Sequence, residues 1–187
     1  MQKKILLAGL MFLLLLVTGC LTTESKEYRY TVKPDGSGDG MITFINILSQ
    51  DDDGRDVSFK DFGELVTDYL EGSSFEESNP NYTVTGKRLY EKNGKLNGEV
   101  TFTFKSIDSV GFFRTANCPC APVLFSTSTL QETLSETNGL SLNESKNIPL
   151  ISWDATAKEY TFKTKVLDDT SNTHSLLEDW THWKDKK

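Results

Sequence analysis

The sequence predicts an α+β, β-rich domain: a mainly antiparallel sheet of hairpins with one or two helices packed on one face. Three observations predict this class. Segments that alternate apolar and polar residues occur in pairs joined by turns. Two other segments have apolar residues at helical spacing. Strands and helices do not alternate regularly along the chain, as they would in a parallel sheet.

The first predicted hairpin joins a strand at residues 28–32 to a strand at residues 41–48. Apolar side chains alternate with polar ones in the first strand, and β-branched and aromatic residues dominate the second. The connection, residues 34–40, is dense in Gly and Asp, which is typical of a turn.

Part of this connection, Asp35 to Gly40, matches the first half of a calcium-binding loop. The second half does not match, because position twelve is Asn46 where the pattern requires a bidentate Glu. A strand is also predicted where a calcium-binding loop would be followed by a helix. We therefore expect a solvated turn and no metal site here.

The next predicted element is a helix that begins near Ser58. Ser58 stands three residues before Asp61 in a capping-box pattern, and Gly72 is placed to end the helix. Apolar residues follow at helical spacing, namely Phe62, Leu65, Val66, Tyr69 and Leu70.

A second hairpin is predicted from residue 82 to residue 104, with its turn at Asn93-Gly94. The pattern is weaker from 106 to 148, where Leu130 and Leu134 predict a brief helix and Asn138-Gly139 marks a turn. Two more strands, at residues 150–153 and 160–166, flank a turn. The chain closes on a predicted helix at residues 175–184, with one apolar face formed by Leu176, Leu177, Trp180 and Trp183. This face is expected to pack on the core; the alternatives are contact with the lipid interface or with a partner protein.

The first twenty residues have the three zones of a secretory signal. Lys3 and Lys4 precede an apolar run, residues 5–17, that spans roughly 20 Å at about 1.5 Å per residue, too short for a hydrocarbon core of about 30 Å. The run ends at Val17-Thr18-Gly19-Cys20, which resembles the lipobox of bacterial lipoprotein precursors. The resemblance implies diacylglycerol attachment to Cys20, cleavage before it, and acylation of the new amino group. The alternative is an ordinary secretory signal in which Cys20 is incidental.

This resemblance divides the chain into three expected parts. Residues 1–19 are the signal peptide, residues 20–27 are the lipidated Cys20 and a polar tether, and residues 28–187 are a single globular domain. The expected location is a bacterial cell envelope, with the membrane as a partner through the lipid on Cys20. Leu21 stands where the family's inner-membrane retention signal is Asp, which implies the outer membrane if the host is diderm.

Composition excludes one class of partner. Removal of Lys3 and Lys4 with the signal changes the formal net charge from −7 to −9, and the chain contains no extensive basic patch. Such a surface repels nucleic acid, so no nucleic-acid partner is expected. The sequence has no Gly-x-Ser-x-Gly and no evident base beside a Ser or Cys, so we expect no enzyme activity, no catalytic residue and no cofactor.

The two cysteines that remain, Cys118 and Cys120, are separated by one residue. In an oxidising compartment they can form a local disulfide, worth about 1.6 kcal/mol in the chain-entropy estimate for a three-residue loop. Alternatively, they can present two soft ligands to Cu(I) or Zn(II), act in redox chemistry, stay unpaired, or pair with a cysteine of another molecule. His174 and His182 lie about 12 Å apart along a continuous helix, too far to bind one ion together, although either could meet the cysteine pair.

These observations predict a non-enzymatic, lipid-anchored envelope protein, a binding or structural module for another envelope protein or a small apolar ligand. The binding site is expected on the sheet or between sheet and helix. The alternative is a metal-binding or redox protein that uses Cys118 and Cys120. The opening hairpin with its Pro34-Asp35-Gly36 turn, followed by a helix and more strands, is similar in layout to the LppM-type mycobacterial lipoprotein domain, which supports the same fold class.

Overall fold

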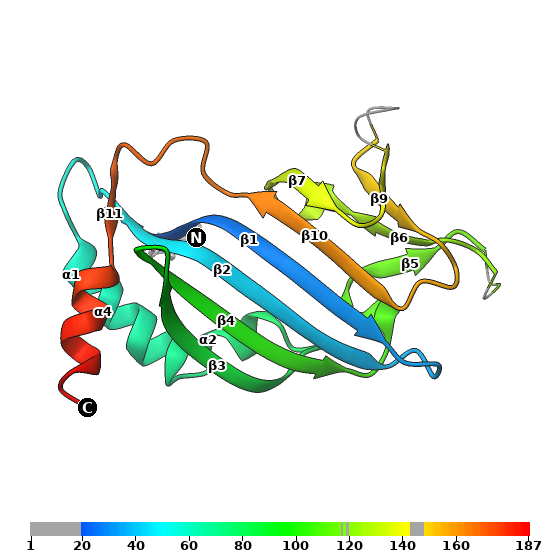
Figure 1. The fold of residues 1–187 in the computed structure, drawn as a ribbon, viewed down its shortest axis with the longest axis horizontal. Coiled ribbons are helices and arrows are strands. Elements are labelled where there is room, and N and C mark those ends of the chain that lie inside the picture. Colours follow the sequence, from blue (N-terminus) through cyan, green and yellow to red (C-terminus); the bar gives the residue numbers. More distant parts are fainter. Residues whose placement is uncertain (1–19, 117, 119, 143–147) are drawn as a thin grey trace, which may run out of the picture.

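A computed structural model describes residues 20–116, 118, 120–142 and 148–187. It confirms the predicted class, because antiparallel strands dominate and helical segments pack against them (Figure 1). The predicted signal peptide, residues 1–19, lies outside the described residues.

The larger sheet has seven strands, in the order β3-β4-β2-β1-β10-β7, with β11 pairing to β2 beyond the end of β4. All of its pairings are antiparallel. The strands are β1 (Leu21–Val32), β2 (Gly38–Gln50), β3 (Thr83–Lys92), β4 (Lys95–Phe104), β7 (Thr133–Thr137), β10 (Glu159–Lys165) and β11 (Thr173–Ser175).

Both predicted hairpins are present in this sheet. β1 pairs with β2 around the turn at residues 33–37, and β3 pairs with β4 around Asn93-Gly94. Asn93 and Gly94 have φ values of 56° and 70°, the positive values that a two-residue hairpin turn of this sequence requires. In the first turn, Asp35 accepts hydrogen bonds from the backbone N–H and the hydroxyl of Ser37, at 3.0 and 2.6 Å.

A second sheet packs against the first through an aromatic core. Its order is β5-β6-β9-β8, and Phe112 contacts Tyr30 of β1 with ring centroids 4.9 Å apart, while Phe125 contacts Phe162 of β10 at the same distance. Its strands are β5 (Phe112–Arg114), β6 (Val123–Ser126), β8 (Leu140–Ser141) and β9 (Leu150–Trp153). The sequence pattern did not predict this second layer.

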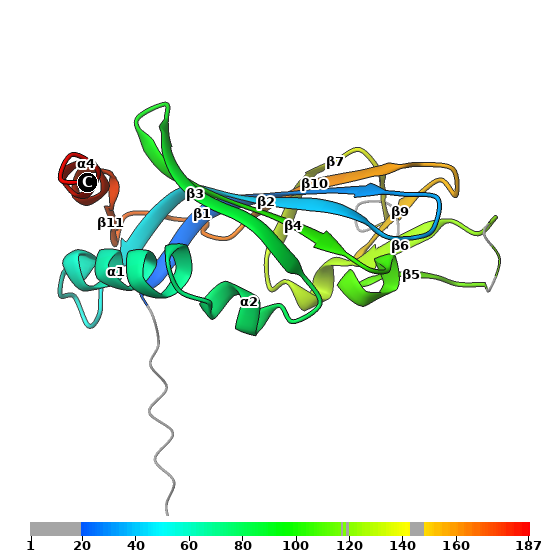
Figure 2. The ribbon, with the colours of Figure 1, turned by 90° about the horizontal axis from the view of Figure 1, so that it is seen from below.

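Helical segments pack near one end of the larger sheet (Figure 2). The predicted helix at residue 58 is present as α1 (Ser58–Glu64) and continues as a π-helix, η1 (Leu65–Leu70), followed by α2 (Ser74–Ser78). The C-terminal helix α4 (Leu177–Lys184) is also present. As predicted, its apolar face packs on a core, where Leu176 and Trp180 join Phe62 of α1. Short 3₁₀ turns, η2 (Ile107–Val110) and η3 (Thr127–Thr129), complete the fold.

Two expectations about local structure are wrong. The helix does not use Ser58 as its cap, since Val57 precedes the first turn and Asp61 is 1% exposed and bonded to Ser49 instead. Residues 130–134 do not form a brief helix, because β7 begins at Thr133.

Two expectations about longer segments are also wrong. The two strands at 150–153 and 160–166 do not pair with each other, because β9 belongs to the second sheet and β10 to the first. The expected tether over residues 20–27 is absent, because β1 begins at Leu21 and pairs with β2 from its first residue. The larger sheet is therefore longer than the alternation pattern indicated.

Candidate functional site

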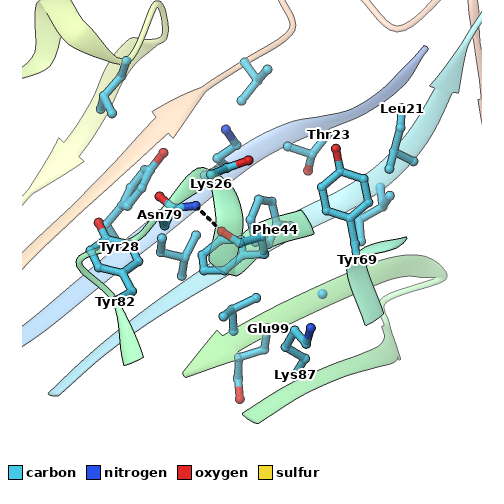
Figure 3. Close-up of a pocket in the computed structure, with 18 of the residues that line it drawn as sticks. Leu21, Thr23, Lys26, Tyr28, Phe44, Tyr69, Asn79, Tyr82, Lys87 and Glu99 are labelled. Carbon is cyan, nitrogen blue, oxygen red and sulfur yellow. Dashed lines mark hydrogen bonds between the residues drawn. The ribbon is translucent and has the colours of Figure 1, made fainter. Parts of the chain in front are cut away.

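A cavity of about 620 Å³ lies between the β1–β4 face of the larger sheet and the segment formed by η1 and α2. Most of its lining is apolar or aromatic. Figure 3 shows Leu21, Thr23 and Tyr69 toward one end of the cavity and Tyr28 and Tyr82 toward the other. A binding site between sheet and helix is expected from the sequence, and this cavity is the candidate for it.

Strand register explains how the cavity floor is formed. Side chains that face one another across an antiparallel sheet form ladders perpendicular to the strands. One ladder runs across four strands from β1 to β3 through Tyr28, Ile42, Val100 and Lys87. The adjacent ladder runs through Lys26, Phe44, Gly98 and Leu89.

Gly98 leaves a gap in the second ladder. It has no side chain to fill the space between Phe44 and Leu89, and a Cβ placed there would lie 3.0 Å from Ile47 Cδ1 and 3.4 Å from Leu89 Cδ2. At this point of the floor, Ile47 and Leu89 therefore occupy the space that a side chain at position 98 would need. Any larger residue at position 98 would shift them or reduce the cavity.

The lining changes strand phase at Asn46. In a regular strand every second side chain faces the same side, so Phe44 and Ile47 would face opposite sides of the sheet. Both nevertheless line the cavity. Asn46 has φ 58°, in the left-handed region, and this interrupts the alternation. Its side chain donates to the Glu24 carboxylate of β1 at 2.8 Å, which links the two strands at this point.

The segment formed by η1 and α2 covers the cavity. It is held by aromatic contacts and contains a π-helical turn. Phe75 of α2 packs edge-on to Phe44, with ring centroids 6.4 Å apart, and also contacts Tyr82 at 6.2 Å. Asn79 Nδ2 donates to the Phe75 carbonyl at 2.8 Å, the bond drawn in Figure 3. In η1 the Glu71 amide donates to the Val66 carbonyl at 2.9 Å, an i→i+5 bond of the kind that often marks functional sites.

Charged groups on the lining are all paired. Lys26 Nζ lies 2.6 Å from Glu132, Lys87 Nζ lies 3.0 Å from Glu76, and Arg88 donates to Glu99 at 2.8 and 2.9 Å. Lys87 also donates to the Gly72 carbonyl. The lining thus offers no unmatched charge to a ligand.

Glu132 is the least exposed of these charged groups. Its side chain is 5% exposed, and its carboxylate accepts hydrogen bonds from the hydroxyls of Tyr28 and Thr164, at 3.0 and 2.6 Å, in addition to Lys26. Burial, and then the neighbouring Glu132 carboxylate, raise the pKa of Tyr28 well above its ordinary value. Tyr28 therefore stays a neutral hydroxyl at the cavity wall.

A second polar pair lies beside the cavity. The hydroxyls of Tyr30 and Tyr82 are 3.1 Å apart, and burial raises the pKa of both residues. Because each hydroxyl combines one donor with acceptor lone pairs, Tyr82 keeps capacity for a polar group of a ligand. Both hydroxyls are neutral, so this pair adds no charge to the cavity wall.

Cys20 lies at the start of the folded chain. Its carbonyl accepts the Gln50 amide at 2.7 Å, and the next residue, Leu21, pairs with Ser49 and lines the cavity. Burial, followed by the charges of Asp61 and Asp52, raises the pKa of the Cys20 thiol. An unmodified Cys20 would accordingly be a weak nucleophile, because the thiolate is the reactive form.

Cys118 and Cys120 are joined by a disulfide bond in the loop between β5 and β6. Figure 1 shows this loop and the β11–α4 segment, which carries His174 and His182, at opposite ends of the molecule. Neither histidine joins the cysteine pair. His174 Nε2 instead lies 2.7 Å from Asp51 Oδ1. Within the described part of the chain, no group of three or more His, Cys, Asp or Glu residues could hold a metal ion.

The sequence patterns missed several residues that the structure brings together. Ser49 Oγ donates to Asp61 Oδ2 at 2.6 Å, but these residues are 0% and 1% exposed, so the pair joins α1 to β2 and is closed to a substrate. Glu132 and Gly98 were also missed, because the contacts that give them their importance come from other strands, such as Lys26 of β1 for Glu132 and Phe44 and Ile47 of β2 for Gly98. The local signal that could have indicated this lining is the spacing of Lys26, Tyr28 and Tyr30, which are two residues apart and therefore share one face of β1.

Comparison with protein-family models, with curated proteins and with solved structures finds no match to this chain. Among the residues that the structure describes, no helix has the length and apolar character needed to cross a membrane. The cavity between β1–β4 and η1–α2 is therefore the feature on which a functional assignment depends.

Proposed function

We propose that this protein is a lipid-anchored, non-enzymatic protein of the bacterial cell envelope that binds a small apolar ligand in the cavity between the sheet and η1–α2. The observation that carries the proposal is the cavity itself. Its volume of about 620 Å³ lies within the range of roughly 300–1,000 Å³ that is typical of small-molecule sites.

The character of the lining supports an uncharged ligand. Aromatic and aliphatic side chains form most of the wall, and the charged residues on it are already paired. A charged ligand would have to compete with these ion pairs, whereas an apolar ligand would gain from removal of its surface from water. The hydroxyls of Tyr28 and Tyr82 could orient one polar group.

The lipid anchor is supported by the sequence at residues 17–20 and gives the second half of the proposal. Intact mass spectrometry of the protein purified from its native membrane tests it directly. A chain that begins at Cys20 and carries acyl groups is expected. An unmodified Cys20 would refute the anchor and leave the cavity proposal to be tested on its own.

Ligand binding is tested with Nile red, an uncharged fluorescent probe, and the chain from residue 20 onward with Cys20→Ser. We expect saturable binding with a blue-shifted emission. Leu89→Trp places a larger side chain beside Gly98 on the cavity floor, so binding should weaken at least about tenfold. Thr83→Trp, on an exposed position of the same strand, is the matched control and should bind normally.

Thermal unfolding of both variants separates a filled cavity from a damaged fold. The proposal requires that Leu89→Trp unfold cooperatively, which shows an intact fold, and that its affinity for the probe be reduced or lost. Equal binding by Leu89→Trp, Thr83→Trp and the parent chain would place the probe outside the cavity and contradict the proposal.

A further inference from the structure

The helix nearest to Cys20 carries an exposed aromatic side chain. Phe59 of α1 is 84% exposed. Gly63 and Thr67, spaced four residues apart along the same helix and its η1 continuation, are exposed as well. Residues at this spacing share one face of a helix, so the three form an uncharged stripe, here called the Phe59 stripe. The Thr67 hydroxyl donates to the Gly63 carbonyl at 3.0 Å.

A chain of direct contacts connects this helix to Cys20. Leu21 pairs with Ser49 of β2, and the Ser49 hydroxyl donates to Asp61 of α1 at 2.6 Å. Asp61 is buried and faces the sheet, whereas Phe59, two positions earlier on the helix, is exposed and faces away from it. Figure 2 shows that β1 begins beside α1, at the edge of the helix that is turned away from the sheet. Phe59 and the lipid-attachment residue therefore lie on the same side of the molecule.

The absence of a tether limits how far this region can be from the bilayer. Seven flexible residues would have allowed a separation of up to roughly 25 Å, at about 3.3–3.6 Å per extended residue. In the structure Leu21 is already in β1, and the Cys20 carbonyl is bonded to the Gln50 amide. A lipid on Cys20 would thus hold the surrounding surface at the level of the headgroups.

We propose that the Phe59 stripe contacts the membrane and fixes the orientation of the domain, with Phe59 inserted among the lipid headgroups. This inference rests on the proposed lipid anchor at Cys20. The lipid supplies the attachment, so one aromatic side chain needs only to favour one orientation over the others. Because Leu21 lines the cavity, this orientation also keeps one end of the cavity close to the bilayer.

The charges around the stripe indicate which lipids it suits. Asp52, Asp53, Asp56 and Glu64 outnumber Lys60 and Arg55 in the adjoining segment. Anionic headgroups would be repelled by this balance, whereas zwitterionic headgroups would not. Lys60 can extend its charged end to the water while its stem follows the apolar surface. The partner is therefore a zwitterionic lipid surface.

The experiment uses the lipidated full-length product reconstituted in phosphatidylcholine vesicles. A single reactive thiol is introduced as Gly63→Cys, at a position where a Cβ meets no atom within 4 Å. Cys118 and Cys120 are in a disulfide, and Cys20 would be lipidated, so an environment-sensitive fluorophore attaches only at residue 63. Lys92→Cys, at the exposed β3–β4 turn, is the matched label site.

The label at residue 63 should be quenched by nitroxide-bearing lipid and protected from aqueous iodide, and the label at residue 92 should show the opposite. Phe59→Ser should lower the ratio of docked to undocked molecules by about tenfold or more, as expected for loss of a buried aromatic side chain. Leu140→Ser is the matched variant, since Leu140 is 64% exposed but belongs to the second sheet, and it should leave the quenching unchanged.

Three outcomes would overturn the inference. Equal lipid quenching at residues 63 and 92 would show that the stripe does not face the membrane. Protection of residue 63 from iodide without lipid quenching would assign the stripe to a protein partner or a second copy of the chain. A chain that does not float with the vesicles lacks the anchor, which is a failure of the proposed function and is recognised before any quenching is measured.

Discussion

Replacing Lys26 by methionine tests whether an ion pair holds the buried Glu132 at the cavity wall. Lys26 Nζ lies 2.6 Å from the Glu132 carboxylate, whose side chain is only 5% exposed. Methionine preserves much of the apolar stem of lysine. The variant therefore removes mainly the charge and its hydrogen bond.

The expected loss follows from the environment of both groups. Breaking a buried ion pair costs about 3–5 kcal/mol, and a hydrogen bond to a charged group contributes about 1.5–3 kcal/mol. The Lys26 side chain is 25% exposed, so water screens part of the pair, and the hydroxyls of Tyr28 and Thr164 still donate to Glu132. We expect Lys26→Met to lower the free energy of unfolding by about 2 kcal/mol at pH 7.

Urea denaturation of the chain from residue 20 onward measures this loss by linear extrapolation. Lys105→Met, at an exposed position, is the control and should change stability by less than about 0.5 kcal/mol. The double variant Lys26→Met/Glu132→Leu should lose less than the sum of the two single variants, because it leaves no unpaired charge. A Lys26→Met variant as stable as Lys105→Met would refute the reasoning.

Two further predictions concern the strands. Gly40→Ala should destabilise the fold by about 1–3 kcal/mol in thermal or urea unfolding, because the added Cβ would collide with the Phe102 ring. Gly63→Ala is the control and should not destabilise the fold, because its Cβ meets no atom within 4 Å. Equal effects of the two substitutions would contradict the packing around Gly40. Hydrogen bonds from Lys95, and then Asn46, lower the pKa of Glu24 from its ordinary value of 4.5. Its ionised form therefore stabilises the fold above about pH 4.5. The advantage of the parent chain over Glu24→Gln should shrink as pH falls below that value, and a pH-independent difference in urea unfolding would contradict this.

Local patterns in the sequence determined the two hairpins, the helix formed by α1 and η1, and the C-terminal helix α4, but not α2. The turn at Asn93-Gly94 and the alternation on either side of it place β3 beside β4, because turn chemistry and strand register act over a few residues. Helical spacing likewise placed α1, η1 and α4, with Trp180 on the buried face.

Local patterns failed where a choice of partner was required. Trp153 and Tyr160 are close in the chain and were expected to lie in one hairpin, yet their strands pair in different sheets and their rings pack in the core with centroids 5.2 Å apart. The tether was predicted because Leu21 to Glu27 is polar, but these residues belong to β1 and lie against Thr43 to Ser49 of β2. Pairing with a distant strand satisfies the backbone N–H and C=O groups of a segment whatever side chains the segment carries. Composition alone therefore does not reveal such pairing.

The expectation of an N-terminal signal and a lipidated Cys20 rests on the sequence by itself, because the pattern that suggests it lies in consecutive residues. The cavity is decided only by the tertiary structure. It needs the ladder of Lys26, Phe44, Gly98 and Leu89 from four strands, and the change of strand phase at Asn46. Each of these residues has an ordinary local context. Long-range register brings them together, and the missing side chain of Gly98 leaves room on the cavity floor for Ile47 and Leu89 from the adjacent strands.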